Sequence, residues 1–418
     1  MNGKPVTEGL GARRAALQIL DAVLRRGQTI DGASSAVRNL LAPDRALAVA
    51  IAGETLRRLP DLDALIDSAT RNRLPDDSKA RMVLRIALAQ KVGLGTPEHA
   101  LVATALPLVD GGPRRLVHGV LGTLLRRGLP PLDAPRLPPE VEQRWADAWG
   151  DDVVAAARRQ IARRPALDLS FADDAEAQAF AKDQCGVSLA PRHVRIDSRS
   201  VTEVAGFGEG RWWVQDLAAS LPARAIRSDA TDVLDLCAAP GGKTMQLAAA
   251  GHRVTGVDAS ESRLGRLREN LERTRLKADL VAADALTWQP RQSYDAILLD
   301  APCSATGTFR RHPEVLYRAR PRIIAEACEL QSRLLARAAQ WLKPGGTLVY
   351  AVCSLEREEG EGIVSRFLDQ HANYELTSTG LPDFAKPDDV GQVRILPGLL
   401  EAEGGLDGFF IARLVRAG

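Results

Sequence analysis

The chain has 418 residues, of which 45% are hydrophobic and 26% charged, a composition typical of a folded protein of two or three domains and unlike that of a fibre or a disordered chain. Its longest apolar run, ALAVAIA at 46–52, is far shorter than the roughly 18 residues that a membrane span needs. The net charge of +2 hides a basic N-terminal part, since residues 1–130 hold 19 Lys and Arg against 12 Asp and Glu. This excess suits an anionic partner.

The first residues, MNGKPVTEGLGARR, contain no apolar signal core, so we expect a cytoplasmic protein with no membrane partner. The five cysteines, at positions 185, 237, 303, 328 and 353, include no Cys-x-x-Cys pair and have no histidine cluster near them. We therefore expect free thiols and no metal.

Residues 10–127 repeat apolar residues at a spacing of three and four, with arginines on the complementary face, as in DRALAVAIAGETLRR and RRLVHGVLGTLLRR. This pattern predicts an all-α bundle over residues 1–130. The proline-rich stretch GLPPLDAPRLPP, residues 128–139, cannot continue a helix and predicts a linker. Short strand patterns around the helical DAEAQAFAKDQ then indicate that residues 131–220 hold this linker and a small α/β module.

From residue 221 to 418, short aliphatic runs alternate with helical stretches. The runs are DVLDL, RVTGVD, ADLVAAD, YDAILLD and GTLVYAVCS, with a last strand in LDGFFIARLVR. Alternating β and α elements with nearly all-apolar strands predict a parallel sheet covered by helices on both faces, which is a Rossmann-like domain. Ligands in such sheets bind at the carboxyl ends of the strands.

The predicted strand ends carry a short set of polar residues. The first strand leads into CAAPGGKT at 237–244, the second ends at Asp258, the third at Asp284, the fourth at Asp300 and the fifth at Cys353. A glycine-rich turn into a helix presents unpaired backbone N–H groups, and a carboxylate that ends the second strand can bind ribose hydroxyls. These features predict a nucleoside-containing cofactor.

Two other ligands fit part of this set. A dinucleotide would require the G-x-G-x-x-G spacing, which the turn lacks. A P-loop is suggested by GKT at 242–244 and by AILLD, but the first glycine of the P-loop pattern would fall on Cys237. That cysteine and the acidic residue after the second strand favour S-adenosylmethionine over a nucleoside triphosphate.

Two cysteines stand apart from the others. Cys303 and Cys353 each follow a predicted strand and each precede a serine, so both thiols would face one cofactor. Packing alone explains such an arrangement poorly, whereas Cys185 and Cys328 are expected to be buried, inert, small side chains.

The stretches LDLCAAPGGKT, LLDAPCSATGTFRRHP and LVYAVCSLEREEGE, with WWVQDLAA before them and LDGFFIARL after them, closely resemble the RNA 5-methylcytosine methyltransferases of the Nop2/Sun family. The resemblance extends from about residue 200 to 418, and the helices before it resemble the NusB-type RNA-binding bundle. Together they resemble the bacterial enzymes that methylate a cytosine of small-subunit ribosomal RNA. The resemblance implies a NusB-like bundle over residues 1–130, an RNA-binding module within 131–220 and a methyltransferase domain over 221–418.

The resemblance also implies the catalytic roles. Cys353 is the nucleophile, although Val352 stands where the family usually has threonine. Cys303 assists proton loss and release of the adduct. Asp300 hydrogen-bonds the cytosine edge, and Lys243 orients the base or Asp300.

S-adenosyl-L-methionine is the implied cofactor, with Asp258 at the ribose and Asp284 at the adenine amino group; either aspartate could instead be only a turn former. The implied cofactor-binding residues are Cys237, Ala238, Ala239, Pro240, Gly241, Gly242, Lys243, Asp258, Asp284 and Asp300. The cluster Arg310, Arg311 and His312, with Arg318, Arg320 and Arg322 beyond it, would line the RNA path by neutralising phosphates.

Three functions remain in competition. The first is cytosine-C5 methylation of small-subunit ribosomal RNA by a monomer; the second keeps this chemistry but acts on transfer RNA. The third is a ribosome-assembly or antitermination factor that binds RNA without catalysis. The basic N-terminal bundle favours ribosomal RNA over transfer RNA, and the intact set of strand-end residues favours an enzyme.

Overall fold

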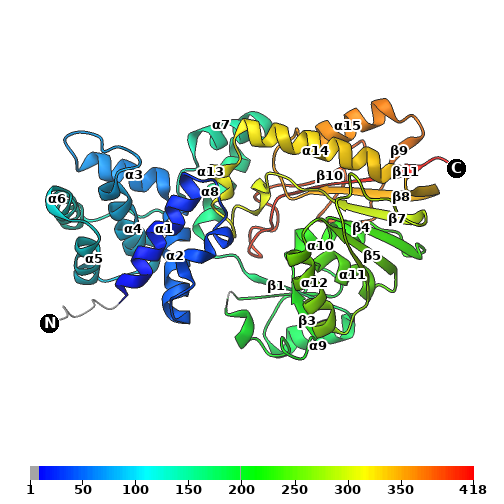
Figure 1. Cartoon of the computed structure of the whole chain (residues 1–418), viewed down its shortest axis with the longest axis horizontal. Coiled ribbons are helices and arrows are strands. Elements are labelled where there is room, and N and C mark those ends of the chain that lie inside the picture. The colour runs from blue at the N-terminus through cyan, green and yellow to red at the C-terminus, as the bar shows by residue number, and fades with distance from the viewer. Residues whose placement is uncertain (1–8, 198) are drawn as a thin grey trace. The chain divides into compact units, whose positions relative to one another are not determined.

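The computed structural model describes residues 9–197 and 199–418 and contains two compact units. One unit comprises Met1–Arg163 and Phe309–Arg318, and the other comprises Arg164–Thr308 and Ala319–Gly418. The boundary at residue 163 lies beyond the one expected near residue 130, because two more helices follow the proline-rich stretch and pack within the first unit (Figure 1). None of the helices among the described residues is long and apolar enough to cross a membrane.

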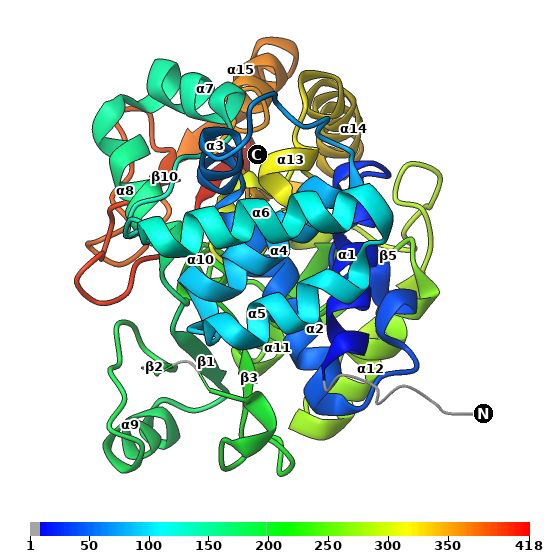
Figure 2. The ribbon, with the colours of Figure 1, turned by 90° about the vertical axis from the view of Figure 1, so that its left-hand side faces the viewer.

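The first unit is helical, as the sequence predicted. Its elements are α1 (Leu10–Leu24), η1 (Asp31–Val37), α2 (Ala42–Arg57), α3 (Leu59–Ser68), α4 (Lys79–Leu94), α5 (Glu98–Ala105), η2 (Leu106–Leu108), α6 (Gly111–Arg127), α7 (Pro139–Trp149), α8 (Asp151–Ala162) and α13 (Val315–Arg318). Helix α4 packs against α1, α2, α3, α5 and α6 and forms the centre of the bundle (Figure 2). Ser78 caps its start by accepting a hydrogen bond from the Arg81 N–H, and Gly95 ends it in the left-handed conformation.

Two arginines of α4 differ from the expectation that arginines occupy the outer face of these helices. Arg81 is fully buried and donates to Asp63 at 3.0 Å and to Asp67 at 2.7 Å. Arg85 is 4% exposed and donates to Asp63 through Nε at 2.7 Å. The planar guanidinium matches carboxylate geometry, which allows the positive charges of both arginines to be buried in hydrogen-bonded ion pairs.

Residues 309–318, which we call the returning segment, lie between two strands of the second unit in the sequence but pack within the helical unit. Phe309 is fully buried, with its ring 5.4 Å from that of Trp145 in an edge-on arrangement. Tyr317, in α13, donates its hydroxyl to the Leu56 carbonyl at 2.7 Å. The helical core is therefore completed by residues that come more than 100 positions later in the chain.

The second unit begins with a three-stranded antiparallel sheet of order β2-β1-β3, which agrees with the small α/β module expected before residue 220. Its elements are β1 (Leu167–Phe171), α9 (Asp174–Asp183), β2 (His193–Ile196), η3 (Val201–Glu203) and β3 (Trp212–Val214). The five residues of β1 are all buried, so this strand forms the centre of the module.

The main sheet has eight strands, and its path runs β10-β11-β8-β7-β4-β5-β6, with β9 paired to β11. The strands are β4 (Asp232–Leu236), β5 (Arg253–Asp258), β6 (Asp279–Ala282), β7 (Tyr294–Asp300), β8 (Leu342–Val352), β9 (Tyr374–Thr377), β10 (Val393–Ile395) and β11 (Phe409–Arg416). Strands β4 to β8 are parallel, as predicted. Strand β11 instead joins β8 antiparallel, and β9 and β10 extend that edge, because antiparallel neighbours need no crossover helix.

Helices cover both faces of this sheet. They are α10 (Leu217–Arg224), α11 (Gly242–Ala249), α12 (Glu261–Thr274), α14 (Pro321–Ala339) and α15 (Glu361–Gln370), while η4 (Thr306–Thr308) is a single turn after β7. Helices α10, α11 and α12 lie on one face, and α14 and α15 lie on the other (Figure 1). Strand order reverses at β4, which pairs with β5 on one side and β7 on the other, and a crevice for ligands opens at such a switch point.

Candidate active site

The turn after β4 has the geometry that the glycine-rich sequence predicted. Cys237 has φ of 61°, and Gly241, at φ 109°, caps the start of α11. A Cβ added at Gly241 would lie 2.1 Å from Cδ1 of Leu267, so only glycine fits both the conformation and the space. The turn therefore presents the first backbone N–H groups of α11 at the carboxyl end of the sheet.

A cavity of about 180 Å³ lies beside this turn. It is lined by Val214, Gln215, Ala219, Asp235, Cys237, Ala238, Ala239, Pro240, Gly241, Gly242, Lys243 and Asp300. Asp235 is fully buried and accepts a hydrogen bond from the Thr244 hydroxyl at 2.6 Å through Oδ2, while its Oδ1 has no hydrogen-bond partner among the described residues. Burial raises the pKa of Asp235 to about 7. The cavity thus offers an acceptor that a ligand donor could satisfy.

Lys243 and Asp300 form an ion pair at the switch point. The Lys243 Nζ donates to Asp300 Oδ2 at 2.7 Å and lies 5.2 Å from the centre of the Phe409 ring. Burial lowers the pKa of Lys243, but the charge of Asp300 and its hydrogen bond outweigh burial and leave that pKa above its usual value. Lys243 is therefore a cation, and the Asp300 side chain remains 30% exposed.

The two strand-end cysteines meet. Cys303 Sγ and Cys353 Sγ lie 3.5 Å apart, and both residues are half-buried. The hydrogen bond with Cys353 and burial raise the pKa of the Cys303 thiol well above its usual range. Burial and the nearby charge of Asp300 raise the pKa of Cys237 to about 12, so its thiol stays protonated at neutral pH.

The remaining cysteines differ from each other. Cys328 is buried, as expected, and burial raises its pKa to about 11. Cys185 is exposed, which corrects the expectation that it is buried. It follows α9 at φ 52°, in a turn at the surface of the small module.

Asp258 and Asp284 already stabilise turns. Asp258 is 3% exposed and accepts from the backbone N–H groups of Ala239 at 3.2 Å and Ser260 at 2.9 Å. Asp284 lies two residues beyond the end of β6, is exposed, and accepts from the Leu286 N–H at 2.9 Å. Neither aspartate is among the residues that line the cavity beside the turn.

The basic cluster of the returning segment is divided by burial. Arg310 is only 2% exposed and its carbonyl accepts from Arg57 at 3.0 Å, so its side chain offers no surface to a phosphate. Arg311 is half-buried, and His312 is exposed with its Nδ1 3.7 Å from Oε1 of Glu314. The expectation that Arg310 contacts RNA is therefore corrected, because its segment packs inside the helical unit and buries its side chain.

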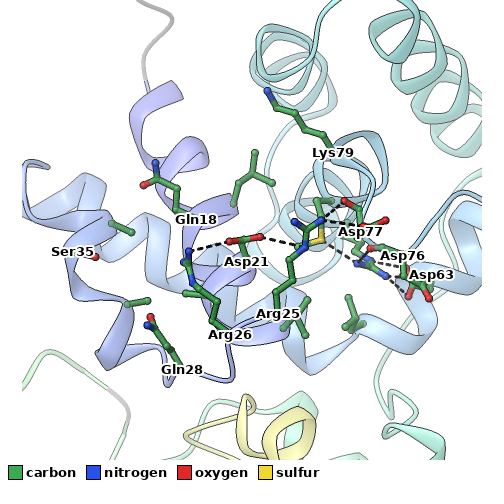
Figure 3. Close-up of a pocket in the computed structure, with 18 of the residues that line it drawn as sticks. Gln18, Asp21, Arg25, Arg26, Gln28, Ser35, Asp63, Asp76, Asp77 and Lys79 are labelled. Carbon is green, nitrogen blue, oxygen red and sulfur yellow. Dashed lines mark hydrogen bonds and ion pairs between the residues drawn. The ribbon is translucent and has the colours of Figure 1, made fainter.

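A cavity of about 880 Å³ lies wholly within the helical unit, between α1 and the start of α4 (Figure 3). Arg25 and Arg26 each lie 3.4 Å from Asp21, and Arg73 donates to Asp76 at 2.9 Å. The cavity is thus lined by charges of both signs. None of the site residues predicted from the sequence lines it.

Two acidic residues of the site were missed in the sequence. Asp235 lies among apolar residues in the strand DVLDL, and an acidic residue inside such a strand could have indicated a functional role. Glu359, fully buried beneath the two cysteines, lies in the run LEREEGE, where nothing distinguishes it from a solvated glutamate.

Residues 225–415 match the family described as 16S rRNA methyltransferase RsmB/F, and residues 10–126 match the NusB family. Among curated proteins, ribosomal RNA small subunit methyltransferase B of Erwinia tasmaniensis is 33% identical over 97% of this chain and 98% of that protein. The protein of the same name from Xanthomonas campestris pv. campestris is 33% identical over the full length of both.

Solved structures agree on the fold. The crystal structure of PH0851 covers 99% of this chain with a TM-score of 0.73 at 23% identity. That of NSun6 from Pyrococcus horikoshii with SFG covers 69% of this chain and all of that one, with a TM-score of 0.59 at 19% identity. With full-length relatives above 30% identity, the chain belongs to the RsmB/F family of 16S rRNA methyltransferases and carries a NusB family domain at residues 10–126.

Proposed function

We propose that this chain transfers a methyl group from S-adenosyl-L-methionine to carbon 5 of a cytosine in small-subunit ribosomal RNA, through a covalent adduct with Cys353. The observation that carries the proposal is the pair of thiols 3.5 Å apart, at the same strand ends as the Lys243–Asp300 ion pair. Carbon 5 of cytosine is a poor nucleophile, so a second nucleophile must activate it.

The residues present fit this cofactor. The turn at 237–243 offers backbone N–H groups, and the unpartnered Oδ1 of Asp235 suits the ammonium group of a methionine moiety. We assign Asp258 to the ribose and Asp284 to the adenine amino group, with the other contacts from Cys237 to Lys243 and from Asp300. When bound, the cofactor supplies an electrophilic methyl group on a sulfonium.

The thiolate of Cys353 adds to carbon 6 of the cytosine and forms a C–S bond. The electron pair of the C5–C6 double bond becomes available at carbon 5, which would take the methyl group as the methyl carbon–sulfur bond of the bound cofactor breaks and its electron pair stays on sulfur. Asp300 accepts a hydrogen bond from the 4-amino group, and the Lys243 ammonium, 2.7 Å from Asp300, stabilises the negative charge that spreads toward N3. These two residues hold the base edge while the adduct exists.

The adduct must then be released. Loss of the C5 proton to water restores the C5–C6 double bond and expels Cys353 as a thiolate. We assign Cys303 to this step, because its S–H can donate to the departing sulfur. Its raised pKa supports the assignment, since a thiol that stays protonated is a donor and a poor nucleophile.

We propose that the helical unit binds the RNA and that Arg311 and His312 contact its phosphates, in a protein that works as a cytoplasmic monomer. Single-stranded or flipped bases are the accessible substrates for such a site, so the target cytosine must leave any helix it occupies.

The test is incubation of the full-length protein with labelled S-adenosylmethionine and unmodified small-subunit ribosomal RNA, assembled small subunits or transfer RNA, followed by nucleoside mass spectrometry. We expect labelled 5-methylcytidine in the ribosomal RNA. Label confined to transfer RNA would support the transfer RNA alternative. The absence of a methylated nucleoside from every RNA would leave only the non-catalytic assembly factor.

A further inference from the structure

A carboxyl group lies buried beneath the two cysteines. Glu359 is fully buried, in the loop between β8 and α15. Among the described residues, no lysine or arginine forms an ion pair with it, and its two oxygens accept hydrogen bonds from four neutral donors. A buried carboxyl group is costly unless its oxygens are hydrogen-bonded, and a fold that supplies four donors to one side chain implies that this side chain has a use.

The four donors connect the two cysteine loops. The hydroxyls of Ser304 and Ser354, the residues directly after Cys303 and Cys353, both donate to the same oxygen, Oε2 of Glu359. The Ser304 N–H donates to Oε1 at 2.8 Å. One side chain thus holds the residue next to each thiol.

Further bonds stiffen the same arrangement. Gln331, on α14, donates through Nε2 to Oε1 of Glu359 at 3.0 Å and to the Pro302 carbonyl at 2.9 Å, so the backbone is fixed on both sides of Cys303. Tyr350, on β8, donates its hydroxyl to the Glu359 carbonyl at 2.6 Å. The carboxylate therefore sits in a rigid frame built from the two strands and a helix.

Charges of opposite sign act on the thiol pair. Lys243, a cation, interacts with Cys353, whereas the Glu359 anion acts on Cys303. The Cys303 thiol therefore keeps its pKa above the usual range partly because of Glu359.

We propose that Glu359 is a positioning residue that holds the Cys303 and Cys353 loops in register and makes the two thiols differ in reactivity. The inference rests on the proposed function, to which it adds the residue that assigns the nucleophile and release roles to two otherwise similar thiols. Glu359 touches neither base nor cofactor in this assignment, so its replacement should change the chemical step and not binding.

The test compares Glu359→Gln with Glu358→Gln, a neighbour whose side chain is exposed. The first measurement is the alkylation rate of each cysteine by iodoacetamide, read by peptide mass spectrometry, which needs no activity. We expect Glu359→Gln to raise the rate of Cys303 relative to Cys353 by about threefold or more, because the anion that opposes its thiolate is gone. Glu358→Gln should leave the ratio at the wild-type value.

The second measurement is steady-state methylation. Glu359→Gln should lower kcat about 10- to 100-fold, as expected when reacting groups are misplaced, with KM for RNA and for cofactor changed less than about threefold. If Glu359→Gln does not fold, Ser354→Ala removes the side-chain bond that ties the Cys353 loop to Glu359 and should lower kcat about 10-fold with KM changed less than about threefold. An unchanged alkylation ratio in a folded Glu359→Gln protein, or an unchanged kcat in Ser354→Ala, overturns the inference. Failure of the wild-type protein to methylate any RNA overturns the proposed function instead, and the alkylation ratio still decides the role of Glu359.

Discussion

Cys303 and Cys353 follow the ends of neighbouring parallel strands, β7 and β8, and their sulfur atoms lie 3.5 Å apart. Fifty residues separate them in the sequence, yet the register Asp300↔Ala351 brings the two strand ends level. Two thiols at this distance can share a hydrogen bond or transfer a proton. One thiol can therefore form a covalent bond to the substrate while the other assists the cleavage of that bond.

The two thiols should therefore respond differently to replacement. We expect Cys353→Ala to lose both methylation and the covalent protein–RNA adduct, because the nucleophile is gone. Cys303→Ala should accumulate an adduct that survives denaturing electrophoresis with labelled RNA, because release is slowed. Cys185→Ala, at the exposed cysteine of the small module, serves as the control and should match the wild type. Adduct formation by Cys353→Ala would show that the two roles are reversed.

The ion pair at the switch point should matter more than an equally short ion pair elsewhere in the sheet. Lys243→Gln leaves Asp300 without its partner, so we expect kcat/KM to fall about 100-fold, the effect typical of losing one charge-stabilising group. Lys343→Gln is the matched control, because Lys343 also donates to an aspartate, Asp295, at 2.7 Å. Asp295 lies near the start of β7, away from the strand end, and the control should stay within about threefold of wild type. Equal losses in both variants would contradict a catalytic role for Lys243.

Asp235 should make the protein less stable as pH rises. Burial raises its pKa to about 7, so the folded protein holds a proton that the unfolded chain releases near pH 4. The stabilisation is complete below about pH 4 and is lost as pH rises through 7. Between pH 4.5 and 8, we expect the free energy of unfolding of Asp235→Asn to rise by about 3 kcal/mol relative to that of the wild type. The measurement is urea denaturation without cofactor.

The control for this effect is Asp232→Asn. An ion pair with Arg253 lowers the pKa of Asp232, so its contribution is constant over the same pH range and the difference from wild type should be flat. A flat difference for Asp235→Asn as well would mean that Asp235 titrates normally.

The returning segment should support the helical unit. Phe309 is fully buried against Trp145, and Phe309→Ala leaves a cavity that we expect to lower the free energy of unfolding of this unit by about 3 to 5 kcal/mol. Hydrogen exchange in α7 should accelerate accordingly. Ile323→Ala, at a residue that is 37% exposed, should change exchange little. Unchanged protection of α7 in Phe309→Ala would show that the segment adds no stability to the unit.

The sequence predicted the parallel part of the sheet and the position of both thiols after strand ends, because apolar strands and their carboxyl ends follow a local pattern. The antiparallel β11 could not be oriented in this way, since strand direction depends on pairing with β8 and not on composition. The burial of Arg310 is equally non-local, because the same letters RRH describe a solvated cluster or a segment packed on distant helices. Glu359 was missed because its donors, Ser304 and Gln331, are supplied by other elements.

The returning segment also constrains how the protein is made. The ribosome releases residues 1–163 of the helical unit first. Two residues that bond to them leave the exit tunnel only after β7 has been synthesised: Glu314, which accepts from the Ile30 N–H, and Tyr317, which donates to the Leu56 carbonyl. The bundle therefore cannot reach its final structure until the Cys303 loop has been synthesised. The order of residues in the chain thus sets when the helical unit can finish folding. A shortened chain that stops after residue 163 would lack ten residues of the helical unit, Phe309 among them, so this unit should be expressed with residues 309–318 restored to it, as a separate peptide or through a linker.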